Sequence, residues 1–284
     1  MKATEKTRKP AVSGRFYPSD PEELRKLIRE LYRRETSRFK ELGDINLVGG
    51  IVPHAGYVYS GHHAIHFFEM ARRYTPDFDT AVIFCPNHGG WGPGVSLDNS
   101  SYWSSPLGKV EVDRDFYPYL DLEASGEAHE FEHSAEVMLP MLQYFFSHDF
   151  KILPVSIWDQ TPEQATTLSL KLLSANKRLE KKLLFIASTD FSHYVSVDSG
   201  KALDDRVLEK IRKFDIKGVC HEVEEKNISV CGYGPIMTLL SLGKLLYAHP
   251  EFQILRRGHS GEVIPSDEVV HYLSAIVYSK AMDV

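Results

Sequence analysis

The first strong pattern in the chain is a set of apolar residues that recur every three or four positions over residues 24–32. Asp20 stands before Pro21, and Glu23 follows three positions after the aspartate. Aspartate accepts hydrogen bonds at a helix N-cap, proline is favoured in the first helical turn, and glutamate at this spacing completes a capping box. We therefore predict a helix that begins after Asp20 and packs its apolar face on a sheet.

Short apolar runs bounded by turn residues predict the strands of that sheet. These runs are residues 48–52, 80–85, 151–157, 183–187, 252–256 and 271–278. The helical patterns between them are residues 61–73, 201–214 and 234–246, a helix opened by Thr161 and Pro162, and one that begins at about Ser134. Because strands alternate with helices and the strand runs have no polar side, the sequence predicts an α/β fold. Its central sheet should be mixed but largely parallel, with helices on both faces.

The chain shows no internal repeat and no linker-like break in composition, so we expect one domain over residues 1–284, with residues 1–12 as a polar tail. Of its 284 residues, 43% are hydrophobic and 25% charged, which is typical of a globular protein. The net charge of −6 comes without a basic patch, which argues against nucleic-acid binding. No apolar run is long enough for a membrane span, and no signal peptide is expected. The three cysteines are not spaced as CxxC, so we expect a cytoplasmic protein without disulfides.

Histidines follow the predicted strands at the points where the strands end. His54 comes after the first strand, His88 after the second, and Asp190 and His193 after the strand at residues 183–187. Ligands of open α/β sheets bind outside the carboxyl ends of the strands. One histidine at a strand end is more often an ordinary hydrogen-bonded turn residue, but the repetition favours a shared cleft.

His129 and His133 have the HExxH spacing of zinc metalloproteases. That site requires both histidines on one helix. The sequence before His129 has the composition of a loop, and the following helical period begins only at about Ser134. We therefore predict that this motif is not a zinc site and that His133 is a polar group at a helix N-terminus, directed at the cleft.

Cys231 precedes a helix that Pro235 would open. The positive end of a helix favours a thiolate, the form of cysteine that binds metals or attacks electrophiles. An inert thiol is equally consistent with this position, and Cys85 and Cys220 resemble small apolar core residues. The glycine-rich loop after His88 lacks the P-loop ending, and no GxSxG motif is present, so nucleotide binding and serine hydrolysis are not expected.

Taken in order, several motifs of this chain resemble those of the Memo family over almost its whole length. The matching motifs are Gly14-Arg15-Phe16-Tyr17-Pro18, Pro53-His54-Ala55-Gly56-Tyr57, Pro86-Asn87-His88, Glu132-His133-Ser134 with Leu139-Pro140, Leu153-Pro154-Val155, Ser188-Thr189-Asp190-Phe191-Ser192-His193, and Cys231-Gly232 with Pro235-Ile236. Each motif alone is weak, but seven in the same order are specific.

The resemblance implies a fold similar to that of class III extradiol dioxygenases, the non-haem iron enzymes that open catechol rings. It implies metal ligation by His54, His88, Asp190 and Cys231, and a redox protein that uses iron or copper, with zinc as a further option. Two histidines and a carboxylate suit non-haem iron, whereas a thiolate shifts the preference toward softer metals such as copper. A thiolate facing iron and dioxygen is readily oxidised, which argues against ordinary ring cleavage.

Among the remaining cleft residues, His193 is expected to act as a general acid or base, because the histidine pKa is near neutral pH. His133 would orient the substrate or an oxygen species, and Cys231 would take part in catalysis. Three hypotheses follow: a metal-dependent redox or dioxygenase-like enzyme, a module that binds a peptide or anion without turnover, and a metal-assisted hydrolase.

The resemblance also carries expectations about partners. Eukaryotic Memo proteins act in cell-motility signalling and bind phosphotyrosine peptides. Prokaryotic members are grouped with an AMMECR-type protein and a radical SAM protein. The ligand is therefore expected to be a small molecule or a short peptide, without nucleic acid or membrane.

Overall fold

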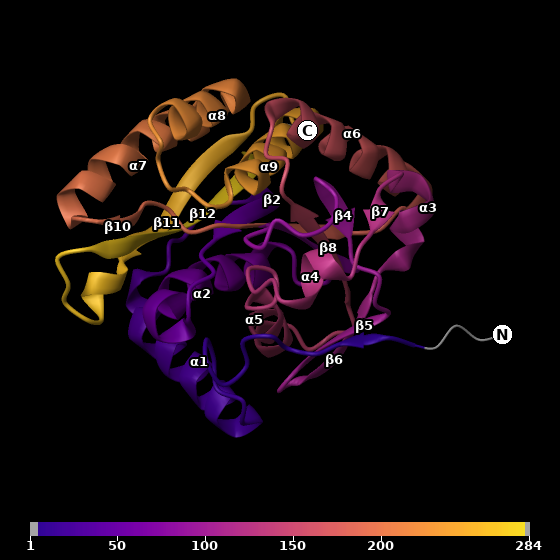
Figure 1. The fold of residues 1–284 in the computed structure, drawn as a ribbon, viewed down its shortest axis with the longest axis horizontal. Helices are drawn as coiled ribbons and strands as arrows, with labels where there is room; N and C mark the ends of the chain where they lie inside the picture. Colours follow the sequence, from indigo (N-terminus) through magenta and orange to yellow (C-terminus); the bar gives the residue numbers. More distant parts are fainter. Residues whose placement is uncertain (1–4, 282–284) are drawn as a thin grey trace.

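The strands of this computed structural model, which describes residues 5–281, join in a twelve-stranded sheet (Figure 1). Its main path runs β1-β5-β6-β8-β3-β9-β2-β12-β10, with β11 paired to β12 and β4 paired to β7 and β8. The strands are β1 (Thr7–Arg8), β2 (Ile45–Val52), β3 (Thr80–Pro86), β4 (Val95–Leu97), β5 (Tyr102–Ser105), β6 (Gly108–Val112), β7 (Glu123–Ala124), β8 (Lys151–Ile157), β9 (Leu183–Ser188), β10 (His193–Val195), β11 (Glu251–His259) and β12 (Val269–Lys280).

The central strands β6, β8, β3, β9 and β2 are all parallel to one another. Strand β12 pairs in the antiparallel sense with β2, β10 and β11, so the sheet is mixed. Every residue of β3 is buried, as expected for a strand covered on both sides. The prediction of a mixed, largely parallel sheet is confirmed.

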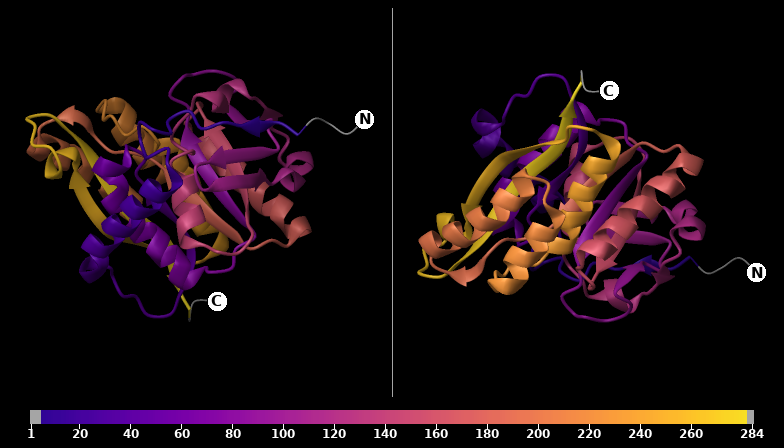
Figure 2. Two further views of the ribbon diagram at one scale, coloured as in Figure 1. Left: turned by 90° about the horizontal axis from the view of Figure 1, so that it is seen from below. Right: turned by 90° about the horizontal axis from the view of Figure 1, so that it is seen from above.

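Helices cover both faces of the sheet, as predicted (Figures 1 and 2). One face carries α1 (Pro21–Glu35), α2 (Tyr57–Tyr74) and α5 (Met138–Phe145), and the other carries α6 (Pro162–Leu179), α7 (Val197–Arg212), α8 (Ile216–Glu225) and α9 (Tyr233–Leu246). The connections contain α3 (Tyr117–Leu120), α4 (Glu127–Glu130) and the 3-10 helices η1 (Thr36–Arg38), η2 (Arg114–Phe116) and η3 (Ser260–Glu262). Among residues 5–281, no helix has the length and apolar character needed to cross a membrane.

Capping side chains begin the helices where the sequence predicts. Asp20 Oδ1 accepts hydrogen bonds from the backbone N–H groups of Glu22 and Glu23, each at 2.9 Å. Thr161 Oγ1 accepts from the backbone N–H of Gln164 at 3.2 Å. These bonds satisfy donors that have no partner inside the helix.

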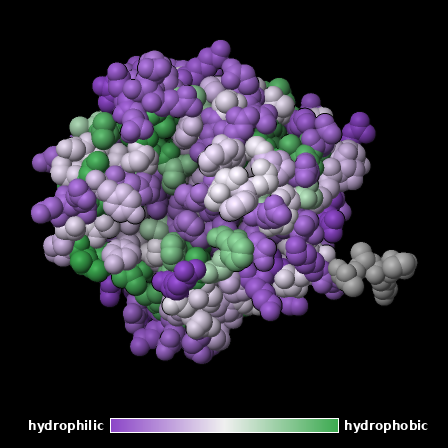
Figure 3. Space-filling view, viewed as in Figure 1, coloured by the Kyte–Doolittle hydropathy of each residue, from purple (hydrophilic) through white to green (hydrophobic). Residues whose placement is uncertain are grey.

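The outward side of α8 is covered by hydrophilic side chains, while its apolar residues face the core (Figure 3).

Two glycines allow strand β2 to lie close to its neighbours. A Cβ atom at Gly49 would lie 2.2 Å from the carbonyl oxygen of Phe185 in β9. A Cβ atom at Gly50 would lie 2.1 Å from the ring of Phe67 in α2. Any larger residue would push β2 away from β9 or from α2, and this strand leads directly into His54.

Several regions differ from the sequence predictions. The segment between β3 and β6 contains the short strands β4 and β5, where the sequence predicts no strand, because its polar residues still supply backbone groups for pairing. Residues 7–12, expected to lie in a polar tail, pack on the body of the protein instead. Arg8 and Val12 are only 6% and 5% exposed, and β1 pairs with β5. Residues 1–4 of the expected tail lie outside the described residues.

A buried carboxylate holds this N-terminal segment in place. Glu136 accepts hydrogen bonds from Arg8 Nη1 at 2.8 Å, from the backbone N–H groups of Ala11 and Val12 at 2.7 and 3.0 Å, and from the Tyr17 hydroxyl at 2.7 Å. Arg8 also stacks on the ring of Trp103 at 4.2 Å. The charges compensate each other in a site from which water is excluded.

Replacing Glu136 with leucine should lower the free energy of unfolding by about 3–5 kcal/mol, because Arg8 would remain buried without its counter-charge. Urea denaturation measures this loss. Asp77→Ala is the control, because the ion pair of Asp77 with Lys182 is exposed and should leave stability almost unchanged. Equal stability of the Glu136→Leu variant and the wild type would contradict the anchoring role.

Candidate metal centre

Three adjacent strands deliver polar residues to one edge of the sheet. His54 follows β2, His88 follows β3, and Asp190 follows β9, which lies between β2 and β3. Because these strands are parallel, their carboxyl ends meet at the same edge. The backbone N–H of His54 donates to Asp190 Oδ1 at 2.8 Å, so the ends of β2 and β9 are tied together.

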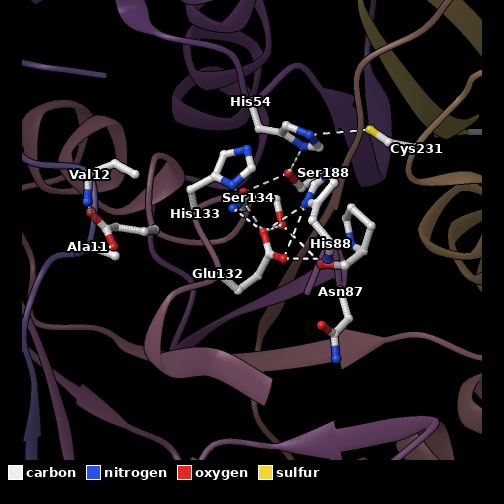
Figure 4. A network of polar contacts seen from close by, with 12 residues as sticks. Ala11, Val12, His54, Asn87, His88, Glu132, His133, Ser134, Ser188 and Cys231 are labelled. Atoms are coloured by element: carbon white, nitrogen blue, oxygen red, sulfur yellow. Dashed lines mark hydrogen bonds and ion pairs between the residues drawn. The ribbon is translucent and has the colours of Figure 1, made fainter. Parts of the chain in front are cut away.

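Three imidazole rings converge at this edge (Figure 4). One ring nitrogen from each of His54, His88 and His133 lies within 4.8 Å of the others. The ring centroid of His54 is 5.3 Å from those of His88 and His133, and the rings of His88 and His133 stack at 4.8 Å. His133 reaches the cleft from the segment between α4 and α5.

Hydrogen bonds determine which nitrogen of His54 faces the cleft. The Ser188 hydroxyl donates its hydrogen to the carbonyl oxygen of Ser134 at 2.7 Å. Toward His54 Nδ1, 2.8 Å away, the same hydroxyl can therefore only accept. Nδ1 carries the hydrogen, and Nε2 presents its lone pair. Burial lowers the pKa of His54 well below its usual value, with the neighbouring histidines adding to the effect, so the ring is neutral.

Glu132 orients the ring of His88, as Ser188 orients the ring of His54. Its carboxylate accepts from the backbone N–H of His88 at 2.7 Å, and its two oxygens lie 3.0 and 3.1 Å from His88 Nδ1. Burial would raise the pKa of Glu132, but the hydrogen bond and charge of His88 lower it to about 2, so it is an acceptor only. Nδ1 of His88 therefore donates, and Nε2 is left for the cleft.

The charge on Glu132 also changes the acidity of His88. Burial would lower the pKa of His88, but hydrogen bonds to Cys231 and Glu132 raise it to about 10. The pKa of His133 moves in the opposite direction, to about 4, mainly because of burial and despite the charge of Glu132. Without a metal, His88 is therefore protonated at neutral pH, while His133 is neutral.

Cys231 brings a sulfur atom beside these nitrogens, in the turn before α9. Its Sγ lies 3.2 Å from His54 Nε2 and accepts from the backbone N–H of Asp190 at 3.2 Å. Burial raises the pKa of Cys231, and a hydrogen bond with His88 opposes this shift. Cys85 and Cys220 are buried elsewhere in the core, as the sequence indicates.

Asp190 and His193 lie at the border of the histidine group. Asp190 Oδ2 is 4.0 Å from His54 Nε2, and burial raises the pKa of this carboxyl to about 7. His193 Nδ1 lies 2.7 Å from the carbonyl oxygen of Ser229, to which it can only donate, so Nε2 is left as the basic nitrogen. Burial lowers the pKa of His193.

The HExxH motif does not form a zinc site in this structure. Helix α4 ends at Glu130, so His129 and His133 do not share a helix. His129 is buried, with Nε2 3.3 Å from the carbonyl oxygen of Ser96. The helix expected from about Ser134 begins later, at Met138, which leaves residues 132–134 in a turn that faces the cleft.

Sequence reasoning did not assign a role to Glu132, Ser134 or Ser188, although all three hold the cleft histidines. The only signal for them was their presence in the motifs Glu132-His133-Ser134 and Ser188-Thr189-Asp190. A carboxylate or hydroxyl that orients a histidine has no fixed sequence spacing from it, since the contact is made across the fold.

Comparisons with known proteins agree with these motifs. A family model described as Memo-like protein matches residues 8–276. MEMO1 family proteins of Methanosarcina barkeri and Methanococcoides burtonii are each 38% identical to this chain, over 95% of it and 99% of their own length. A MEMO1 family protein of Sulfolobus acidocaldarius is 39% identical over 93% of this chain and 97% of its own. The similarity thus includes every segment that contributes to the cleft.

Replacing Glu132 with glutamine should lower the pKa of His88 in the metal-free protein by at least about one unit, because the imidazolium loses the negative charge that stabilises it. The ring nitrogen and carbon signals of His88, followed by NMR against pH, measure the change. Glu130→Gln, at an exposed position two residues away, should leave the titration unaltered. An unchanged His88 titration in Glu132→Gln would rule out this pairing.

Proposed function

The chain belongs to the Memo-like protein family, and from this membership and the geometry of the cleft we propose that it binds one redox-active metal ion, iron or copper, for metal-dependent redox chemistry. The observation that carries the proposal is the convergence of imidazoles whose Nδ1 atoms are occupied by Ser188 and Glu132. A histidine that binds metal through Nε2 is held in this way, with Nδ1–H donated to a neighbouring acceptor.

We assign the principal ligand atoms as Nε2 of His54, Nε2 of His88 and Sγ of Cys231. The 3.2 Å separation of the sulfur from His54 Nε2 is close to the separation of roughly 3.0–3.5 Å between donor atoms that share one ion. Asp190 Oδ2 lies 4.0 Å from the same nitrogen, while Oδ1 accepts from the His54 backbone N–H. We assign Oδ2 as the carboxylate donor of the site.

The donor set favours a redox-active metal. Imidazoles suit iron, copper and zinc, and a thiolate adds a preference for softer or redox-active ions. When bound, such an ion supplies one-electron and dioxygen-linked chemistry that amino-acid side chains do not offer. The thiolate also argues against ordinary ring cleavage, because sulfur beside iron and dioxygen is readily oxidised.

Two further histidines beside the ligands can donate or accept hydrogen bonds and protons. His133 stacks on His88 and has a pKa of about 4, so at neutral pH it is a neutral hydrogen-bonding group facing the cleft. His193 is oriented by Ser229 and leaves Nε2 available to hold a proton. We assign His133 to orienting a bound substrate and His193 to general acid–base catalysis.

Metal content tests the proposal directly. Protein reconstituted without oxygen with Fe(II) or Cu(I) should retain about one equivalent in the cleft, and His54→Ala or His88→Ala should lose it without unfolding. Cys231→Ser should retain less copper than the wild type, because the soft ligand is removed. The matched control is His221→Ala, an exposed histidine on α8. Full metal content in both His54→Ala and His88→Ala would contradict the proposal.

The two competing functions give different results in the same preparations. A module that binds a peptide or anion should bind its ligand in metal-free protein, as measured by calorimetry. A metal-assisted hydrolase should be restored by zinc and act on esters or phosphate esters without consuming oxygen. Either result, together with an absence of redox activity in the iron and copper forms, would replace the proposed function.

Metal affinity should rise with pH. His88 has a pKa of about 10, so its Nε2 carries a proton that the ion must displace. The Cys231 thiol, whose pKa burial raises, must lose its proton as well. Affinity should therefore increase by up to about a hundredfold per pH unit between about pH 7.5 and 9, with about two protons released per ion. Calorimetry in buffers of different ionisation enthalpy counts those protons. The Glu132→Gln variant should show a flatter pH dependence, and an affinity that does not change with pH in the wild type would contradict the assignment of His88.

A further inference from the structure

A second group of metal-ligating side chains lies outside the cleft, where helix α2 meets the connection between β11 and β12. His62 and His63 are neighbours on α2, and Glu262 belongs to the 3-10 helix η3 in that connection. One donor atom from each of the three residues lies within 4.8 Å of the others. No residue of this group is among those that form the histidine cleft.

His63 is the unusual member of this group. Its side chain is completely buried, and neither ring nitrogen has a hydrogen-bond partner among the described residues. An unpartnered polar group in the interior costs free energy, commonly about 1–3 kcal/mol. Burial also lowers the pKa of His63 well below its usual value, so the imidazole is neutral. A neutral, unpartnered imidazole is the form of histidine that binds a metal ion.

The separations between the donor atoms suit a single ion. Glu262 Oε2 lies 3.4 Å from His62 Nε2 and 3.9 Å from His63 Nε2. Ligand bonds of about 2.1 Å in tetrahedral geometry separate neighbouring donor atoms by roughly 3.4 Å. We propose that His62, His63 and Glu262 form a second metal site, which takes a zinc-like divalent cation and leaves a fourth position for water.

Neighbouring residues hold the carboxylate in the required orientation. Arg256 Nη2 donates to Glu262 Oε2 at 2.9 Å, and Arg256 Nε in turn lies 3.4 Å from Glu35 Oε2. Glu35 also accepts from Arg38 Nη1 at 2.8 Å, so two guanidinium groups balance the two carboxylates. A Cβ atom at Gly258 would lie 2.1 Å from Glu262 Oε1 and 2.5 Å from His63 Cε1, so a glycine is needed for this approach.

Such an ion would connect helix α2 to the loop that joins the last two long strands. The side chains of His62 and Glu262 are 12% and 29% exposed, which gives an ion access from solvent, while His63 supplies the buried end. Binding would add stability to this loop by mass action, because the unfolded chain does not assemble the three ligands.

Zinc binding to the whole chain of 284 residues tests the site. The measurement uses a His88→Ala background so that the cleft does not contribute. The probe is Zn²⁺ alone. We expect His62→Ala and Glu262→Gln each to lose one equivalent of zinc, and zinc to raise the melting temperature of the background protein but not of these variants. Circular dichroism verifies that the variants are folded, and Glu262→Gln retains the shape of the side chain.

His221→Ala serves as the control for adventitious binding by an exposed histidine. Crystals of the background protein soaked in zinc should show an anomalous peak between His62, His63 and Glu262. Unchanged zinc stoichiometry in both site variants, or an anomalous map without that peak, would overturn the proposal. Neither result depends on whether the histidine cleft binds iron or copper.

Discussion

The parallel pairing of β2, β9 and β3 is the constraint on which the cleft depends. The register places Val52 beside Ser188 and Phe84 beside Ala187, so the three strands end at nearly the same level. Backbone hydrogen bonds between the strands set this level. The absence of side chains at Gly49 and Gly50 keeps β2 close enough for the pairing. His54, His88 and Asp190 then meet because the chain turns at the end of each strand.

A second constraint is that buried imidazoles need partners for their Nδ1 hydrogens. Ser188 and Glu132 supply these partners for His54 and His88, and they do so with different electrostatic effects. Burial and the neighbouring histidines keep His54 neutral, whereas hydrogen bonds to Cys231 and Glu132 overcome the effect of burial on His88 and raise its pKa to about 10. Two residues of one type in one cleft therefore differ in protonation because their surroundings differ. An incoming cation meets one open lone pair and one nitrogen that must first release a proton.

The sequence was sufficient for the sheet, its main helices and the meeting of the strand ends, since these follow from hydrophobic periodicity and parallel topology. The sequence also indicates that His133 faces the cleft, and the structure places it there. The sequence was insufficient for Glu132, which approaches from a segment that is irregular in structure. The sequence indicates a helix from about Ser134, but the helix begins at Met138, so Glu132 lies in a non-helical segment whose contacts the periodicity does not predict. The position of Asp190 at the cleft follows from the sequence. The hydrogen bond that its Oδ1 accepts from the backbone N–H of His54 does not, because sequence spacing does not reveal it.

The N-terminal segment shows how distant residues support the cleft. Arg8 donates to the carbonyl oxygens of Glu132 and His129, at 2.6 and 2.7 Å, and its charge is balanced by Glu136. Hydrogen bonds from Arg8 in strand β1 thus hold the backbone of the turn that carries Glu132 and His133. Glu136, which follows that turn, binds the N-terminal segment through its carboxylate. A residue expected in a polar tail therefore holds the backbone of the carboxylate that orients His88. Because a turn lacks the internal hydrogen bonds of a helix, bonds of this kind are what give its side chains a defined position.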